Sequence, residues 1–276
     1  MIDKDSSVKL VTTILKNSDT SLSTTVPSQI SANLKSAYEI VERVEKIIGD
    51  KTHGDYFGSS VKRYLHYFSA AMTIEKGSKI LDIGNAPGHV AIGLHLSGME
   101  VQGINLNELW NDTYPSPEWL DVFKVIACDI EKTDLPFENN SFDAVYFTEV
   151  LEHIAITDPT KILTEIKRVL RPSGLLVFST PNICNISNIH ALMNEINIYW
   201  APEIFYGSLD RHNREFTPRE VNSILQNAGF TDITMYGINC DSNWRSGTSE
   251  FIYNLISKIG DDHSLLRNTI MALVKC

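Results

Sequence analysis

Cysteines and long apolar runs are both scarce in this sequence, and their scarcity excludes two classes of protein. The 276 residues contain four cysteines with no Cys-x-x-Cys spacing, which is not the framework of a disulfide-stapled miniprotein. Apolar runs such as Leu175–Phe178 and Ile270–Val274 have the length of strands, far short of the roughly 20 residues that cross a bilayer. We expect no secretory leader ahead of the cysteines. We therefore expect a cytoplasmic protein without a membrane span.

Positive charge is also in short supply. The 24 lysines and arginines are outnumbered by 34 aspartates and glutamates, and the formal net charge of -10 lacks the electrostatic footprint of a nucleic-acid binder. The hydrophobic fraction of 43% over this length is sufficient for one large core or two small ones. We expect a soluble globular protein with no nucleic-acid partner.

The N-terminal quarter is predicted to contain two helices behind a mobile arm. Residues 1–30 are rich in Ser, Thr, Asp and Lys, a composition that seldom closes a core. Apolar residues then recur at steps of three and four over Ser31–Ile48 and again over Ser59–Met72, which predicts two amphipathic helices. We assign residues 31–75 to a helical cap. Its apolar faces can pack on the rest of the chain or on a second copy, so a homodimer is an open alternative.

From Gly77 onward, short β-type runs alternate with helical ones, which is typical of a parallel sheet with right-handed crossovers. Helices are expected over Lys161–Leu170, from a capping box at Thr217 to Ala228, and over Glu250–Ile259. The expected strands are Lys79–Ile83, Glu100–Ile104, Phe123–Ala127, Phe142–Phe147, Leu175–Ser179, Thr231–Ile238 and Thr269–Lys275.

A glycine turn follows the first of these strands. Gly84 and Gly88 allow a sharp turn and the close approach of a ligand, and the amides at the start of the next helix favour an electron-rich group. The pattern Asp82-x-Gly84-x-Ala86-x-Gly88 resembles motif I of the class I S-adenosylmethionine-dependent methyltransferases, Asp-x-Gly-x-Gly-x-Gly, with Ala86 at the middle glycine. The resemblance extends from Gly77 to about Phe230.

The resemblance implies an α/β fold, a Rossmann-like class I methyltransferase sheet of seven strands with the last antiparallel, over residues 76–276. It also implies S-adenosylmethionine as cofactor. In this family an acid at the end of the second strand holds the ribose hydroxyls. Here the uncharged Asn105 stands at that position, so one charge-assisted contact is lost unless Glu108 supplies it. Asp129 would face the exocyclic amine of the adenine and Ile130 its ring. The implied cofactor-binding residues are Asp82, Gly84, Gly88, Asn105, Asp129, Ile130 and Thr148.

A group of acids and histidines follows the fourth expected strand. If a helix opens at Glu149, then Glu149 and Glu152 lie one turn apart, with His153 beside them. This Glu-x-x-Glu-His segment resembles the metal-binding motif of the ubiquinone-biosynthesis O-methyltransferases and the small-RNA 2′-O-methyltransferases, which add a later histidine. The resemblance implies Glu149, Glu152, His153 and His212 as ligands of one divalent metal ion, for which Mg, Mn, Fe and Zn are all suitable.

These residues suggest two mechanisms for methyl transfer to a hydroxyl. The donor sulfonium is already activated, so the protein must position and deprotonate the acceptor. A divalent metal would lower the pKa of the hydroxyl, or His153 or His212 would act as catalytic base without a metal. Both remain open.

The acceptor is expected to be a small molecule. Residues 183–211 form a long insertion that includes Tyr199 and Phe205, which are expected either to close over the acceptor as a lid or to pack on the core. Ser179-Thr180-Pro181-Asn182, followed by the segment around His212, resembles bacterial methyltransferases of polysaccharide and natural-product biosynthesis. We expect an O-methyltransferase acting on a sugar, polyol or phenol; the alternatives are an N-methyltransferase without metal and a non-catalytic S-adenosylmethionine-binding protein.

Overall fold

The computed structural model describes residues 9, 13, 21–22, 25–49, 56–199, 201–206, 211–239 and 265–276. Most of the expected N-terminal arm, and the helix expected over Glu250–Ile259, lie outside the described residues. Among the helices that are described, none is both long and apolar enough to cross a membrane.

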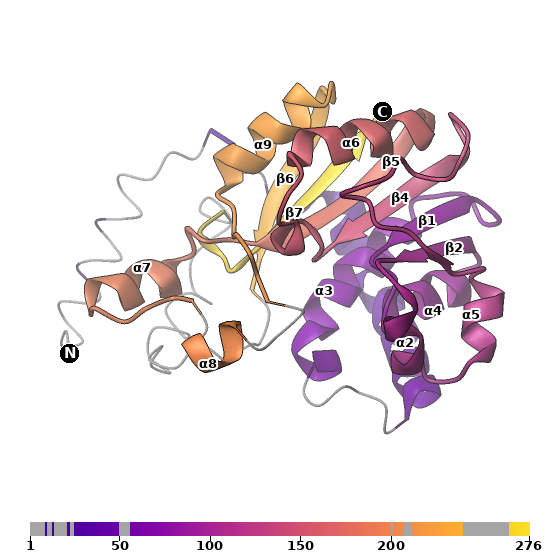
Figure 1. The fold of residues 1–276 in the computed structure, drawn as a ribbon, viewed down its shortest axis with the longest axis horizontal. Coiled ribbons are helices and arrows are strands. Elements are labelled where there is room, and N and C mark those ends of the chain that lie inside the picture. Colours follow the sequence, from indigo (N-terminus) through magenta and orange to yellow (C-terminus); the bar gives the residue numbers. More distant parts are fainter. Residues whose placement is uncertain are drawn as a thin grey trace.

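A seven-stranded sheet forms the centre of the described structure (Figure 1). Its order is β3-β2-β1-β4-β5-β7-β6, and only β7 runs antiparallel to its neighbours. This confirms the predicted α/β sheet with the last strand antiparallel. The strands are β1 (Lys79–Ile83), β2 (Glu100–Asn105), β3 (Ile126–Ala127), β4 (Phe142–Thr148), β5 (Leu170–Pro181), β6 (Asp232–Ile238) and β7 (Thr269–Lys275).

The direction of strand order reverses at β1. The chain moves outward from β1 through β2 to β3 and then returns to place β4 on the other side of β1. Ligands of open α/β sheets bind at the carboxyl ends of the strands beside such a reversal. The ends of β1 and β4 are therefore where a functional site is expected.

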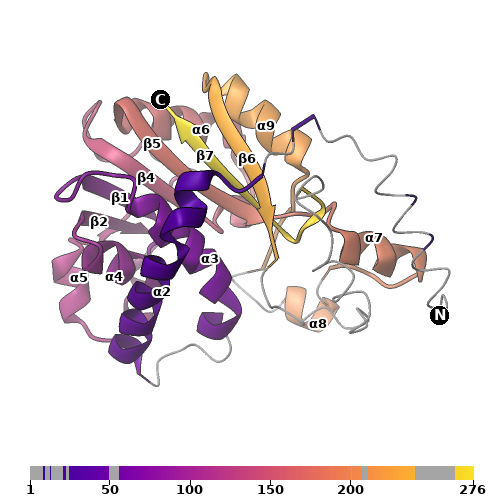
Figure 2. The ribbon, with the colours of Figure 1, turned by 180° about the vertical axis from the view of Figure 1, so that it is seen from behind.

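Helices cover both faces of the sheet, and a separate apolar core fills each side. On one face α2 (Ser28–Ile48), α3 (Tyr56–Ala71), α4 (His89–Leu96) and α5 (Glu118–Val122) pack over side chains such as Ile80 and Tyr146 (Figure 2). On the other face α6 (Pro159–Val169) and α9 (Pro218–Asn227) pack over Leu81 and Phe147. The expected capping box opens α9, since the Thr217 hydroxyl accepts from the Glu220 amide and the Glu220 carboxylate from the Thr217 amide.

The two N-terminal helices form as expected, at nearly the predicted bounds. Val41 of α2 and Phe68 of α3 are buried in the same core as Ile80 of β1. The helices therefore cover the sheet directly. The division of the chain into an arm, a cap and a methyltransferase domain remains a prediction.

Two strands differ from their predicted bounds for reasons of local packing. β3 is only Ile126–Ala127 because Phe123, expected in the strand, instead follows α5 and stacks on Trp119 with ring centroids 5.3 Å apart. β5 starts earlier than expected because Leu170 already pairs with Phe142, after which the register shifts.

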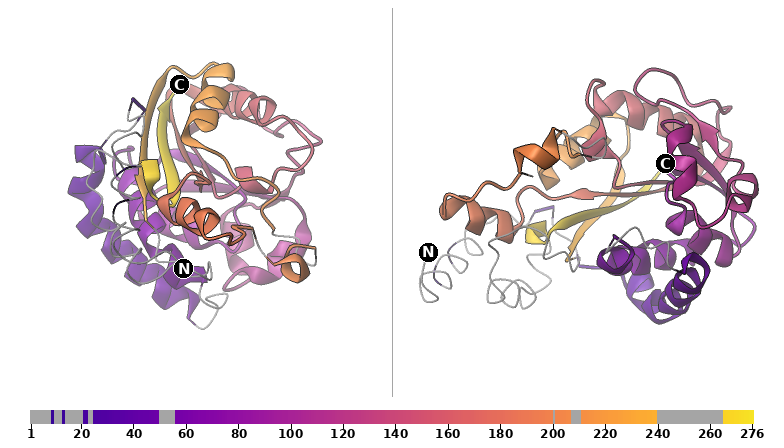
Figure 3. Two further views of the ribbon diagram at one scale, coloured as in Figure 1. Left: turned by 90° about the vertical axis from the view of Figure 1, so that its left-hand side faces the viewer. Right: turned by 60° about the horizontal axis from the view of Figure 1, so that its bottom comes forward.

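The insertion after β5 projects from the sheet. Its helix α7 (Ile186–Met193) lies away from the main body, with α8 (Pro202–Phe205) below it (Figures 1 and 3). Leu192 and Met193 at its end are exposed. Trp200 and residues 207–210 of the expected lid lie outside the described residues, and closure over an acceptor remains a prediction.

Candidate active site

The glycine turn after β1 has the conformation that its two glycines permit. Gly84 and Gly88 have φ values of 75° and 89°, in the region that other residues rarely adopt. A Cβ on Gly84 would lie 2.5 Å from Cγ2 of Val150, and one on Gly88 would lie 2.7 Å from Cδ1 of Tyr114. Both positions therefore need glycine for backbone and space alike. The turn leads straight into α4, which begins at His89 directly after Gly88.

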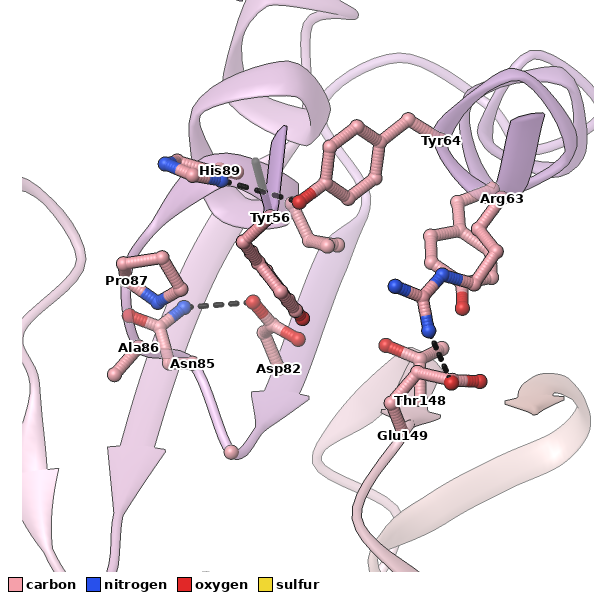
Figure 4. A pocket seen from close by; sticks show the side chains of 13 residues that line it. Tyr56, Arg63, Tyr64, Asp82, Asn85, Ala86, Pro87, His89, Thr148 and Glu149 are labelled. Atoms are coloured by element: carbon pink, nitrogen blue, oxygen red, sulfur yellow. Dashed lines mark hydrogen bonds and ion pairs between the residues drawn. The ribbon is translucent and has the colours of Figure 1, made fainter. Parts of the chain in front are cut away.

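A pocket lies between this turn and α3 (Figure 4). It holds about 360 Å³ of space between atoms, part of it open to solvent. The helix α3 supplies aromatic and charged groups, β1 and the turn supply backbone and polar groups, and the end of β4 closes the far side. The lining residues are Tyr56, Arg63, Tyr64, Tyr67, Asp82, Gly84, Asn85, Ala86, Pro87, His89, Val90, Thr148 and Glu149.

Asp82 is a buried acid in the pocket wall. Only 2% of the residue is exposed, and its Oδ2 accepts a hydrogen bond from Nδ2 of Asn85 at 2.7 Å. Burial raises the pKa of the Asp82 carboxyl to about 7, and the hydrogen bond from Asn85 opposes this only in part. A carboxyl in this environment changes its charge near neutral pH.

Arg63 and Glu149 form an ion pair in one wall of the pocket (Figure 4). Their side chains are only 13% and 12% exposed. The other Glu149 oxygen accepts a hydrogen bond from the Ser179 hydroxyl at 2.6 Å, and this hydroxyl also bonds to the Tyr67 hydroxyl at 2.6 Å. Glu149 has a left-handed backbone with φ of 55°, which is uncommon outside glycine and is often found at functional sites.

The structure places the predicted cofactor-binding residues in two groups. Asp82, Gly84 and Thr148 line the pocket, and Gly88 sits between its lining residues Pro87 and His89. The other three lie elsewhere. Asn105 is buried behind the turn, the Asp129 carboxylate bonds to Nζ of Lys132 at 2.6 Å, and Ile130 packs against the core. Glu108, offered as a substitute for the ribose-binding acid, is exposed.

A second group of polar side chains lies on the other side of β5. Potential ligand atoms of Glu152, His153 and His212 all lie within 4.8 Å of one another. Glu152 is 1% exposed and accepts a hydrogen bond from the Thr180 hydroxyl at 2.9 Å; burial, together with the charge of Glu149, raises the pKa of its carboxyl. We refer to these three residues as the Glu152 cluster.

Both histidines of the Glu152 cluster are oriented through Nδ1. His153 donates from Nδ1 to the Arg211 carbonyl at 3.1 Å, and His212 donates to the Glu215 carboxylate at 3.0 Å. Such bonds fix the tautomer and ring orientation of histidines at metal sites. Nε2 of His153 lies 3.9 Å from a Glu152 oxygen.

Glu149 is not part of the Glu152 cluster, contrary to the predicted ligand set of four. The helix expected to open at Glu149 does not form, since only Leu151–His153 makes a single 3-10 turn. Ser179 and Thr180, which hold the two glutamates, are neighbours in β5, and neighbouring strand residues point to opposite faces of a sheet. The two carboxylates are therefore held by hydroxyls on opposite faces of β5.

The sequence did not reveal the contribution of α3 to the pocket. The predicted site does not include Arg63, and the segment that forms α3 is assigned to the helical cap. Tyr64 is buried but also lines the pocket, where its hydroxyl shares a hydrogen bond of 3.1 Å with Nδ1 of His89 (Figure 4). The available signal was an arginine on the aromatic side of a predicted helix.

The strand order and the glycine turn at the strand-order reversal define a class I methyltransferase fold. A family model described as "Methyltransferase domain" matches residues 55–235, and the chain belongs to this family. The predicted fold and family are thereby confirmed. The resemblance to the ubiquinone-type metal motif remains a prediction.

Curated relatives match only part of the chain. Sterol 24-C-methyltransferase ERG6B of Gibberella zeae is 34% identical over 128 residues, which are 45% of this chain and 33% of the relative. A probable S-adenosylmethionine-dependent methyltransferase of Mycobacterium tuberculosis is 35% identical over 105 residues, 38% of this chain and 32% of the relative. The matched regions thus span about a third of the length of these relatives.

Solved structures share the fold at low sequence identity. A putative methyltransferase of Haloferax volcanii, in complex with its Trm112 activator, has a TM-score of 0.55 and 17% identity over 83% of this chain and 96% of that one. Phosphoethanolamine N-methyltransferase 2 of Haemonchus contortus, in complex with S-adenosyl-L-methionine, has a TM-score of 0.53 and 18% identity over 91% of this chain and 60% of that one. Both show a likeness of fold.

Proposed function

We propose that the protein transfers a methyl group from S-adenosylmethionine to an oxygen of a small molecule. Family membership supports the methyl transfer, and the pocket at the end of β1 supports a bound donor. The Glu152 cluster supports oxygen as the acceptor atom. A hydroxyl must lose its proton to react, and this cluster supplies groups that can accept that proton.

The pocket residues suit the donor chemically. Gly84 and Gly88 let the backbone approach a ligand, and Asp82 places a buried carboxyl beside it. Arg63 and Glu149 put one cation and one anion in the same wall, which matches the charged carboxylate and ammonium of an amino-acid group. We assign Asp82, Gly84, Gly88 and Thr148 to the donor.

The Glu152 cluster also has the chemistry of a metal site. One carboxylate and two oriented imidazoles suit Mn, Fe or Zn, and Mg where water completes the set. A divalent ion bound there would lower the pKa of an acceptor hydroxyl. Without a metal, the bond from Nδ1 of His153 to the Arg211 carbonyl leaves Nε2 as the nitrogen that accepts a proton. We propose His153 as the main catalytic group and His212 as its partner.

A carbon acceptor is the second candidate. The 34% identity to a sterol 24-C-methyltransferase favours it, and the same histidines would then accept the proton that leaves the methylated carbon. A metal-free N-methyltransferase and a non-catalytic donor-binding protein are the remaining alternatives.

The first experiment is calorimetric titration with S-adenosylmethionine. We expect binding in the micromolar range, and no binding at millimolar donor would refute the enzyme proposal. Transfer of labelled methyl groups to panels of hydroxyl, amine and alkene acceptors then separates the candidate reactions.

The second experiment tests the Glu152 cluster. We expect His153→Ala to lower turnover at least 100-fold, while His95→Ala, at an exposed position of α4, leaves it unchanged. Equal metal content in the wild type and the double variant Glu152→Gln/His212→Ala would refute the proposed metal site. Full activity of His153→Ala in EDTA would favour N-methylation instead.

A further inference from the structure

Asn105 ends β2 at the position where the sequence predicted a contact with the donor ribose. The residue is only 4% exposed. Its Oδ1 accepts a hydrogen bond from the Ala86 amide at 2.9 Å, and its Nδ2 donates to the Tyr114 hydroxyl at 3.1 Å. Both ends of the amide are thus engaged within the protein, and Asn105 is not among the residues that line the pocket.

The hydrogen bonds continue from Asn105 to the pocket wall. The Tyr114 hydroxyl donates to Oδ1 of Asn85, and Nδ2 of Asn85 donates to Oδ2 of Asp82 at 2.7 Å. The chain of donors has one direction, from the Asn105 amide to the Asp82 carboxyl. An aspartate at 105 would accept from the Ala86 amide but could not donate to Tyr114, so this arrangement requires an amide.

Two glycines leave the space that this network occupies. A Cβ on Gly88 would lie 2.7 Å from the Tyr114 ring, and a Cβ on Gly103 would lie 2.7 Å from Cγ of Asn85. The ring of Tyr114 therefore packs against Gly88, the last residue of the turn, and the Asn85 side chain packs against Gly103 of β2. Sterics and hydrogen bonding fix the same conformation.

We propose that Asn105 and Tyr114 are positioning residues that hold the glycine turn, residues 84–88, in its binding conformation, and that Asn105 does not contact the donor ribose. The departure from the acidic family pattern then has a structural cause: the side chain at 105 binds the turn instead of the ligand. The assignment of the ligand as S-adenosylmethionine rests on the proposed function, whereas the role in holding the turn does not.

The role in holding the turn is tested in the ligand-free protein by hydrogen exchange. Asn105→Ala and Tyr114→Phe should each speed amide exchange in the peptide 84–96 by about tenfold, as expected for the loss of a buried hydrogen bond. Asn139→Ala and Tyr38→Phe, which alter exposed side chains elsewhere, are the matched controls. Tyr114→Phe keeps the ring against Gly88, so this variant still tests the proposal if Asn105→Ala unfolds. Unchanged exchange in Tyr114→Phe would overturn the proposal.

The absence of a ribose contact is tested with S-adenosylhomocysteine and its analogues lacking the 2′ or the 3′ hydroxyl. If Asn105 only positions the turn, Asn105→Ala lowers the binding affinity for all three ligands by the same factor. Tyr114→Phe also lowers the three affinities by one common factor. If Asn105 binds a ribose hydroxyl, the preference of the wild type for the intact ribose disappears in Asn105→Ala, which would overturn the proposal. A wild type that binds none of the ligands would refute the proposed function, and the exchange experiment would still decide the role of the network.

Discussion

The buried carboxyl of Asp82 makes stability depend on pH in a predictable direction. Burial raises its pKa from 3.8 to about 7, so the folded protein prefers the neutral acid. The stability contributed by the neutral form is fully present below about pH 4 and is lost as pH rises through about 7. The difference between the two pKa values corresponds to at most about 4 kcal/mol.

The substitution Asp82→Asn removes this titration while it keeps an oxygen that can accept from Asn85. Near pH 4 the variant and the wild type should have similar free energies of unfolding. At pH 8 the variant should be more stable, by up to about 4 kcal/mol. Other groups that titrate in this range, such as Glu152, contribute to both proteins and cancel in the difference.

Urea unfolding of both proteins between pH 4 and pH 8 measures this difference. Asp121→Asn, which changes an exposed acid on α5, is the matched control. A difference between wild type and Asp82→Asn that stays constant across this range would show that burial does not penalise the Asp82 carboxylate, and would refute the reasoning.

Three further predictions concern groups around the pocket. Arg63→Met leaves the Glu149 carboxylate buried without its cation and should lower the free energy of unfolding, measured in urea, by about 3–5 kcal/mol. The double variant Arg63→Met/Glu149→Gln should recover most of this loss. A double variant as unstable as Arg63→Met would contradict the reasoning. Gly88→Ala forces a side chain into a left-handed backbone and against a ring, which should cost at least about 2 kcal/mol in thermal unfolding, and an unchanged melting temperature would argue against it. Glu131→Ala removes the acceptor of three consecutive amides, residues 155–157, so their hydrogen exchange should accelerate severalfold while exchange in α9 stays constant.

Local sequence patterns were sufficient for most of the sheet. β1 and β7 have the predicted bounds because each is an apolar run between turn residues, and such a run can only be a buried strand in this context. Phe123 shows the limit of this reasoning. Its aromatic ring suits a strand equally well, but Phe123 caps the end of α5, where it stacks on Trp119 one helical turn earlier.

The candidate site was predictable only where it is local in sequence. The glycine turn is a continuous segment, so Asp82 and Gly84 could be assigned to the pocket. Arg63 comes from a helix that precedes the motif, and nothing in its own segment indicates which residue it will pair with. The spacing of Glu149 and Glu152 suggested a shared helical face, but the left-handed backbone at Glu149 removes the helix on which that inference depended.

The adjacent residues Ser179 and Thr180 serve the pocket and the Glu152 cluster from either side of a single peptide bond. Ser179 belongs to the hydrogen bonds of the pocket below α3, and Thr180 to those of the Glu152 cluster. The two groups thus take hydrogen bonds from neighbouring residues of one strand, and the charge of Glu149 in the pocket still acts on Glu152 in the cluster. The end of β5 therefore links the pocket wall to the Glu152 cluster, so a shift of the backbone at residues 179–180 would displace side chains in both.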